Sequence, residues 1–128
     1  MRVPAIIAMV LLPTLSSAHS MSPGFEVEYA VTTAHTKTYT ITNDYDFPAV
    51  YKIEVFNKDF TPATDWRADK ISFNILPRNS KQADIQFKAT TTRKLIVCST
   101  LTEIGKENEK ASIISRVCSR LIINGVTR

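Results

Sequence analysis

Glycine and histidine are scarce in this chain of 128 residues, which contains three glycines and two histidines. The glycines, at positions 24, 105 and 125, lie too far apart to form a phosphate-binding loop. His19 and His35 form no metal-spaced pair with each other or with a cysteine. Asp44 and Asp46 flank Tyr45 in a turn, where aspartates are favoured for local backbone hydrogen bonds alone. We therefore expect no metal, no cofactor and no enzymatic activity.

Clusters of positive charge are lacking as well. The chain has 16 basic and 12 acidic residues, and its formal net charge of +4 is mild. Since no Lys/Arg cluster and no stripe of aromatic residues occurs, we do not expect nucleic-acid binding. Beyond the first residues no apolar run is long enough to span a bilayer, so we expect a mature chain without a membrane span.

The first 18 residues have the pattern of a secretory signal peptide. Arg2 supplies a positive charge, an apolar run extends from Val3 to Leu15, and small residues end at Ala18. An N-terminal membrane anchor is the alternative, but the run is too short for one and contains two prolines. Cleavage after Ala18 would leave one domain, residues 19–128, in the periplasm or at the cell surface, and cleavage after Ser20 is the alternative.

The rest of the chain alternates between apolar and polar residues with a period of two, which predicts strands and no helix. Phe25, Val27 and Tyr29 begin the first run and predict a half-buried strand. Residues 57–70 break the alternation, and within them we interpret Trp66 as a packing residue. Seven short strands favour an all-β, antiparallel immunoglobulin-like sandwich, with a small barrel as the alternative. The runs cover residues 25–31, 37–42, 48–56, 71–75, 83–87, 95–104 and 111–123.

The last two runs predict a β-hairpin tied by a disulfide bond. If they pair about Asn108, residues whose numbers sum to 216 lie opposite each other, and this register opposes Cys98 and Cys118, the only cysteines. Opposed residues at a non-hydrogen-bonded site are close enough for a disulfide. The register puts Leu95 on the expected core face. Ile104 falls on the other face with three more isoleucines, so we expect contacts on both faces.

Three segments, taken in order, resemble the N-terminal domain of the PapD-like periplasmic pilus chaperones. Residues Tyr39 to Asp44 with Phe47 to Tyr51 are similar to that family's second strand, its Asn-containing turn and its Pro-led third strand. Phe73 to Phe87 resembles its run through a Pro-containing turn. Leu95 to Ile104, with Ala111 to Ile123, is similar to its last two strands. The resemblance implies a PapD-like sandwich.

The resemblance also implies a binding site on the last strand. In that family this strand inserts apolar side chains into an incomplete pilus subunit, and a basic pair anchors the subunit's C-terminal carboxylate. By position, Ile113, Ser115 and Val117 fall among the inserting residues, and Arg120 falls on the basic anchor. This sequence departs from the family at the second anchor, because no basic residue lies between His19 and Lys37. The family also has a second sandwich domain, for which we expect no counterpart in this chain.

We therefore expect an exported, chaperone-like binding module that assists assembly of a pilus or surface structure by strand addition through its last strand. Its partner would be a protein, either a pilus subunit or an usher-like assembly component, and self-association remains open. The alternative is a structural subunit of a pilus or of an envelope secretion apparatus. A small periplasmic enzyme or ligand carrier is a weaker third interpretation, because the sequence indicates no pocket.

Overall fold

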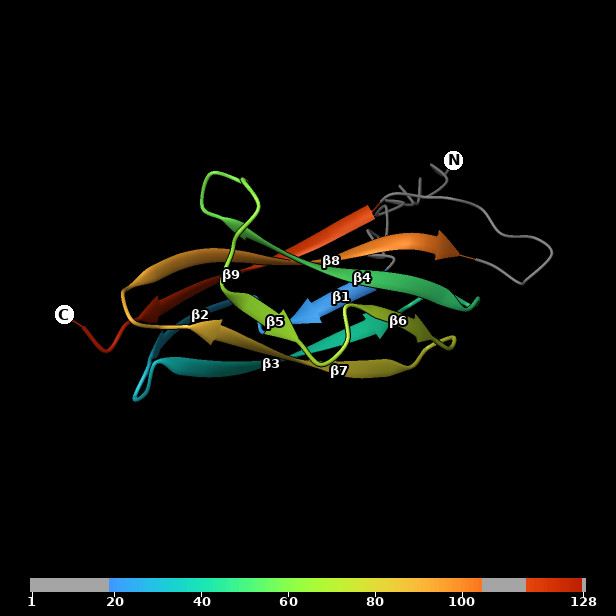
Figure 1. The fold of residues 1–128 in the computed structure, drawn as a ribbon. Helices are drawn as coiled ribbons and strands as arrows, with labels where there is room; N and C mark the ends of the chain where they lie inside the picture. Colours follow the sequence, from blue (N-terminus) through green and yellow to red (C-terminus); the bar gives the residue numbers. More distant parts are fainter. Residues whose placement is uncertain (1–18, 105–114, 128) are drawn as a thin grey trace, which may run out of the picture.

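The computed structural model of this chain describes residues 19–104 and 115–127. Within these residues it contains nine strands and no helix (Figure 1). The strands are β1 (His19–Ser22), β2 (Phe25–Tyr29), β3 (Ala34–Asn43), β4 (Ala49–Asn57), β5 (Trp66–Ala68), β6 (Ser72–Ile75), β7 (Ser80–Lys88), β8 (Arg93–Ile104) and β9 (Ser115–Asn124). The prediction of an all-β chain is confirmed.

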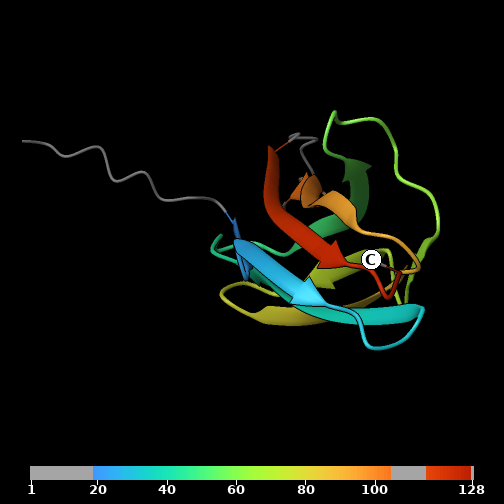
Figure 2. The ribbon, with the colours of Figure 1, turned by 90° about the vertical axis from the view of Figure 1, so that its left-hand side faces the viewer.

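Two sheets pack face to face into a sandwich (Figure 2). The four-stranded sheet has the order β1-β3-β7-β5, and the five-stranded sheet has the order β2-β9-β8-β4-β6. Neighbouring strands are antiparallel except for β2 and β9, which are parallel. The expected immunoglobulin-like sandwich is therefore confirmed, with nine described strands instead of seven.

The two strands that were not predicted are both short. β1 lacks a clear apolar alternation, and β5 is a three-residue pairing inside the segment expected to be irregular. Trp66 opens β5 and packs, half-buried, against the core, as predicted. A strand of three or four residues owes its conformation to the neighbour it pairs with, which a local pattern does not reveal.

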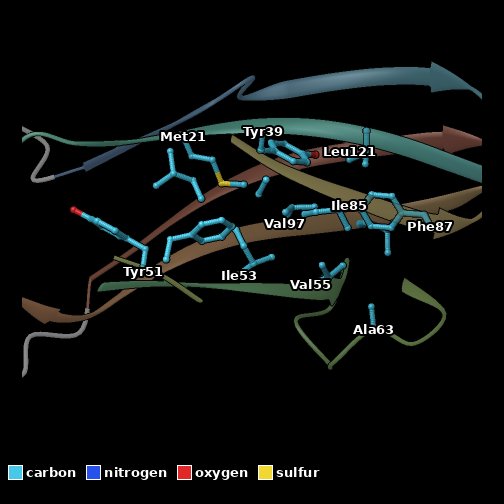
Figure 3. Close-up of a cluster of buried hydrophobic side chains, with 14 of the residues drawn as sticks. Met21, Tyr39, Tyr51, Ile53, Val55, Ala63, Ile85, Phe87, Val97 and Leu121 are labelled. Carbon is cyan, nitrogen blue, oxygen red and sulfur yellow. The ribbon is translucent and has the colours of Figure 1, made fainter. Parts of the chain in front are cut away.

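The core lies between the sheets and is built by alternating side chains (Figure 3). Tyr51, Ile53 and Val55 of β4 face Ile85 and Phe87 of β7, and all five are at most 3% exposed. Fully burying one such side chain contributes about 1.5 to 3 kcal/mol. The alternation on these strands therefore predicts the buried face correctly.

The chain crosses from one sheet to the other between β1 and β2. β1 pairs with β3, whereas β2, after the cis Ser22–Pro23 bond, pairs with β9 of the opposite sheet. His19 starts β1 inside the core, where its Nε2 donates to the carbonyl of Ser99 over 3.1 Å and its ring lies 4.7 Å from that of Tyr51. Burial lowers the pKa of His19 below its ordinary value, so the imidazole is neutral.

Strand β2 has the opposite orientation to the one predicted. Its parallel register with β9 sets Glu26 and Glu28 beside the buried Leu121 and Ile123, so the two glutamates point inward. The apolar side chains therefore point outward: Phe25 is 55% exposed, Val27 45% and Tyr29 63%. A period of two identifies a strand but not which of its faces is buried, and here the pairing with β9 decides that.

The register of the last hairpin is confirmed. Residues that sum to 216 pair along β8 and β9, including Leu95 with Leu121. Cys98 and Cys118 form the expected disulfide, with a separation of 4.0 Å between their Cα atoms. The bond ties the middle of β9 to the centre of its sheet.

Ile104 lies on the face opposite to the predicted one. A β-bulge between Val50 and Tyr51 of β4 shifts the pairing with β8, so that Ala49 opposes Ile104 while Tyr51 opposes Leu101. One extra residue on β8 reverses the side-chain alternation beyond it. Ile104 consequently joins the core, whereas Ile96 is covered on the outer face.

We predict that removing the disulfide lowers stability without changing the fold. The bond closes a loop of 20 residues, for which chain entropy predicts a loss of about 3 kcal/mol in the free energy of unfolding. Urea denaturation of the Cys98→Ala/Cys118→Ala variant would measure the loss. An unchanged unfolding midpoint would contradict this role, and labelling of two free thiols in the native protein would show that the bond does not form.

Candidate functional site

Strand β9 is paired on both sides over only part of its length. It lies beside β8 from Ser115 to Ile123 but beside β2 only from Arg120 to Asn124. Among the described residues, no strand pairs with the other side of Ser115–Ser119. Figure 2 shows β2 and β9 next to each other at the rim of the sandwich. We call Ser115–Ser119 the open edge. An open edge is a template on which another strand can pair.

The backbone groups of the open edge can be assigned from the strand that covers the rest of β9. The Arg120 N–H donates to the carbonyl of Gly24, and the Ala30 N–H donates to the carbonyl of Asn124, both over 2.9 Å. Backbone groups alternate in direction along a strand. Arg116 and Cys118 have the same parity as Arg120, so they direct their N–H and C=O groups outward at the open edge.

The structure brings together three of the four predicted site residues. Ser115 and Val117 are half-buried on the open edge, with Val117 packed against the core, and the exposed Arg120 lies where the open edge ends and β2 begins. Ile113 lies outside the described residues. Ser115, Val117 and Arg120 thus lie on one continuous stretch of β9.

Arg116 is a further residue of this edge that the sequence reasoning missed. Its Nη2 lies 3.3 Å from Oε1 of Glu54, its Nε donates to Oγ1 of Thr100, and its guanidinium stacks 5.1 Å from the ring centre of Phe56. These contacts hold the Arg116 side chain on the outer face of the sheet, away from the open edge. The sequence contains a pattern that could have identified it, since the alternation of side chains sets Arg116 on the same face as Arg120.

Arg120 has no basic neighbour on β2. The residue paired with it is Phe25, and the Arg120 guanidinium lies over the Phe25 ring at 6.0 Å from its centre. An aromatic face attracts a cation and fixes its position without neutralising its charge. Arg120 therefore remains able to bind an anion at the end of the open edge.

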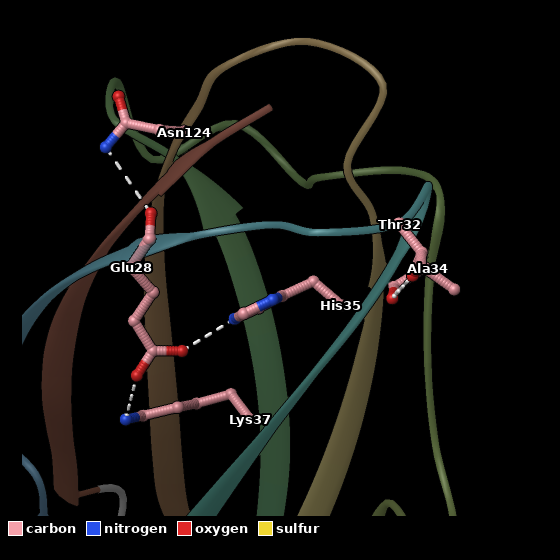
Figure 4. Close-up of polar contacts among 6 residues, drawn as sticks. All are labelled: Glu28, Thr32, Ala34, His35, Lys37 and Asn124. Carbon is pink, nitrogen blue, oxygen red and sulfur yellow. Dashed lines mark hydrogen bonds and ion pairs between the residues drawn. The ribbon is translucent and has the colours of Figure 1, made fainter. Parts of the chain in front are cut away.

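Strand β2 is held in place by an ionic cluster around Glu28 (Figure 4). His35 donates from Nε2 to Oε1 of Glu28 over 2.6 Å, and Lys37 donates from Nζ to Oε2. The three side chains are at most 22% exposed and join β2 of one sheet to β3 of the other. Burial opposes ionisation, but the hydrogen bonds from Lys37 and His35 outweigh it and lower the pKa of Glu28. We call these three residues the Glu28 clamp.

The described part of the chain offers no metal centre. Across residues 19–104 and 115–127, no three His, Cys, Asp or Glu side chains gather closely enough to hold an ion. In the same residues no helix is long and apolar enough to cross a membrane.

Comparisons with known proteins reveal relatives in structure alone. No family model and no curated protein matches the chain. The SafB chaperone of Salmonella enterica, solved with the SafA pilin, matches with a TM-score of 0.68 and 15% identity over 84% of this chain and 54% of that chain. The E. coli chaperone DraB matches with a TM-score of 0.64 and 15% identity, over 84% and 55%. The chain thus spans about half the length of these chaperones.

The fold also occurs outside bacteria. WR4, an MSP family member of C. elegans, matches with a TM-score of 0.63 and 14% identity over 84% of this chain and 98% of that chain. Identities this low show the fold alone. The predicted resemblance to PapD-like pilus chaperones is therefore confirmed for the fold.

We predict that Glu28→Gln loosens β2. Hydrogen bonds to a charged group contribute roughly 1.5 to 3 kcal/mol, so we expect a loss of about 1 to 2 kcal/mol for this partly exposed group at pH 7. Because the folded state lowers the Glu28 pKa, the stabilisation is present above the unfolded value of about 4.3 and is lost as pH falls through the folded pKa. Urea denaturation from pH 7 to pH 3 would test both effects.

The matched control is Glu26→Gln. Glu26 has the same inward orientation on β2 but receives no hydrogen bond from His35 or Lys37. We expect the stability of the Glu28→Gln variant to fall less with acid than that of the wild type, and Glu26→Gln to behave like the wild type. Equal acid dependence in all three proteins would show that the clamp contributes nothing.

Proposed function

We propose that this protein is an exported, chaperone-like binding module that assists assembly of a pilus or related surface structure by strand addition. The observation that carries the proposal is the open edge Ser115–Ser119, which is followed by an exposed cation, Arg120. On its other side the strand is joined to β8 by the disulfide. The fold shared with pilus chaperones, one of them solved with its pilin, supports the same function.

Each part of β9 has a role in this proposal. An added strand would bond to the outward backbone groups of Arg116 and Cys118, while Ser115 and Val117, with Ile113, supply side chains to the partner's groove. Arg120 would hold the partner's terminal carboxylate by charge-assisted hydrogen bonds. Because the disulfide keeps β9 ordered before binding, the entropy lost on association is smaller.

The start of β1 helps to choose between the two expected sites of signal-peptide cleavage. His19 is 1% exposed, hydrogen-bonded to the carbonyl of Ser99 and stacked near Tyr51, so a mature chain that kept the core intact would retain it. This favours cleavage after Ala18 over cleavage after Ser20. The remaining domain, residues 19–128, would act in the periplasm, where the Cys98–Cys118 disulfide can form. The proposed role needs no catalysis and no cofactor.

A structural subunit is the second candidate. The observation that favours it is the outward face of β2, where Phe25, Val27 and Tyr29 lie exposed beside the open edge. Apolar surface next to an unpaired strand favours association between copies of one chain. A subunit would form a concentration-dependent series of its own oligomers, whereas a chaperone would form a one-to-one complex with a pilus subunit or an usher-like component.

We predict that Arg116→Pro abolishes partner binding and that Arg116→Ala does not. Both variants lose the guanidinium, but only proline removes the outward N–H and places its ring in the path of an added strand. The pairing of β9 with β8 stays intact, because Arg116 directs its backbone groups away from β8. The measurement is the amount of partner that co-purifies at stoichiometric levels with the tagged, exported protein. Equal recovery with both variants would contradict strand addition.

We also predict that Arg120→Ala weakens the complex while the free protein keeps its fold. Arg120 is exposed, so its loss should leave the unfolding midpoint unchanged and raise the dissociation rate of the partner. Lys81→Ala is the matched control, since Lys81 is an exposed cation on β7 of the other sheet. If the partner dissociated from the Arg120→Ala variant at the same rate as from the wild type, the carboxylate anchor would lie elsewhere.

A further inference from the structure

A groove on the outer face of the five-stranded sheet begins at Arg120. It encloses about 190 Å³ between β2, β8, β9 and the residues that follow β4. Apolar side chains and three cations line it. The apolar ones are Phe25, Leu95, Ile96, Leu121 and Ile122, and the cations are Lys58, Lys94 and Arg120.

The charge in the groove has one sign. None of the described residues that line it is acidic, and Lys58, Lys94 and Arg120 come from three separate parts of the chain. Arg120 pairs across the ladder with Ile96 of β8, and Lys94 lies two residues before Ile96 on the same face. Three cations over an apolar floor favour a ligand that joins an anionic group to an apolar body.

The inverted orientation of β2 builds the apolar wall. With Glu28 held inside by His35 and Lys37, Phe25 on the same strand is turned outward, toward Arg120. A shift of β2 by one residue would bury Phe25 and set a glutamate beside Arg120, which would neutralise the groove. The Glu28 clamp thus keeps an aromatic ring, and no carboxylate, at this position.

The open edge fixes which end of a partner strand reaches the groove. β9 runs from Ser115 toward Arg120, and Gly24 and Phe25 occupy its edge from Arg120 onward, so an added strand must stop there. A strand parallel to β9 would arrive with its C-terminal carboxylate, and an antiparallel strand with its amino group. The cations attract the carboxylate and repel the amino group.

We propose that Lys58 and Lys94 complete a carboxylate site with Arg120, in place of a cation on β2, and that Phe25 and Ile122 select a partner whose last residue is apolar. The inference rests on the proposed strand addition and specifies its partner: a chain that ends in a free carboxylate on a large apolar residue. Lys94 pairs with Ile122, two residues beyond Arg120 on β9. A terminal residue that reaches Lys94 from Arg120 must therefore extend over the outer face of the sheet.

The test uses two acetylated seven-residue peptides of alternating valine and threonine that end in phenylalanine, one with a free carboxylate and one with an amide. Their binding to the exported protein is measured by fluorescence anisotropy. We expect the acid peptide to bind more tightly than the amide. Lys58→Gln/Lys94→Gln should weaken the acid peptide about tenfold, the combined effect of two exposed ion pairs, and leave the amide unchanged. Lys52→Gln, an exposed cation of β4 outside the groove, is the matched control.

Selection of the terminal residue is tested with a third peptide that ends in serine. We expect the wild type to prefer the phenylalanine peptide and the Phe25→Ser variant to lose that preference. Equal affinity of the wild type and the double lysine variant for the acid peptide would overturn the carboxylate site, as would no binding of that peptide at millimolar concentration.

The failure of strand addition itself would look different. Arg116→Pro should abolish binding of both acid and amide peptides. If both peptides bind the Arg116→Pro variant normally, strand addition at the open edge is wrong. If Arg116→Pro blocks both peptides but the lysine substitutions have no effect, strand addition stands and the groove inference falls.

Discussion

The pairing of β8 with β9 is the interaction on which the rest of the structure depends. β8 lies in the middle of its sheet, and the bond between Cys98 and Cys118 fixes β9 against it. Because β9 is held firmly from this side, its other side can stay open over Ser115–Ser119 without loss of the strand. Exposed edges promote aggregation when they are long and apolar. Here the open edge is short, it contains the basic residue Arg116, and it is followed directly by Arg120.

The sequence predicts the hairpin well and the first strands poorly. The hairpin has two cysteines and a regular alternation on both of its runs, so one register satisfies every constraint. β2 has an equally regular alternation, yet its apolar face points outward because a distant strand sets its register. The prediction for Ile104 fails for a related reason, since the extra residue of β8 is revealed only by the pairing with Val50 and Tyr51 of β4. Local patterns identify strands, whereas the face that each strand buries depends on pairing.

The candidate site shows the same division. Ser115, Val117 and Arg120 lie on one strand, so their arrangement could be read from their spacing. The groove could not be predicted from the sequence, because Phe25, Lys58 and Lys94 come from three parts of the chain that only the folded sheet brings together. No motif marks the two lysines, and only the pairing of β2 with β9 shows that an aromatic ring stands opposite Arg120.

The parallel pairing of β2 with β9 also affects how the chain reaches its fold. Gly24 and Ser119, which are hydrogen-bonded to each other, are 95 residues apart in sequence. A contact between the two ends of a domain requires closure of almost the whole chain, which slows folding. It also cannot form until β9 has been synthesised. The sandwich is therefore closed by β9, and the open edge belongs to the described strand that is synthesised after the other eight.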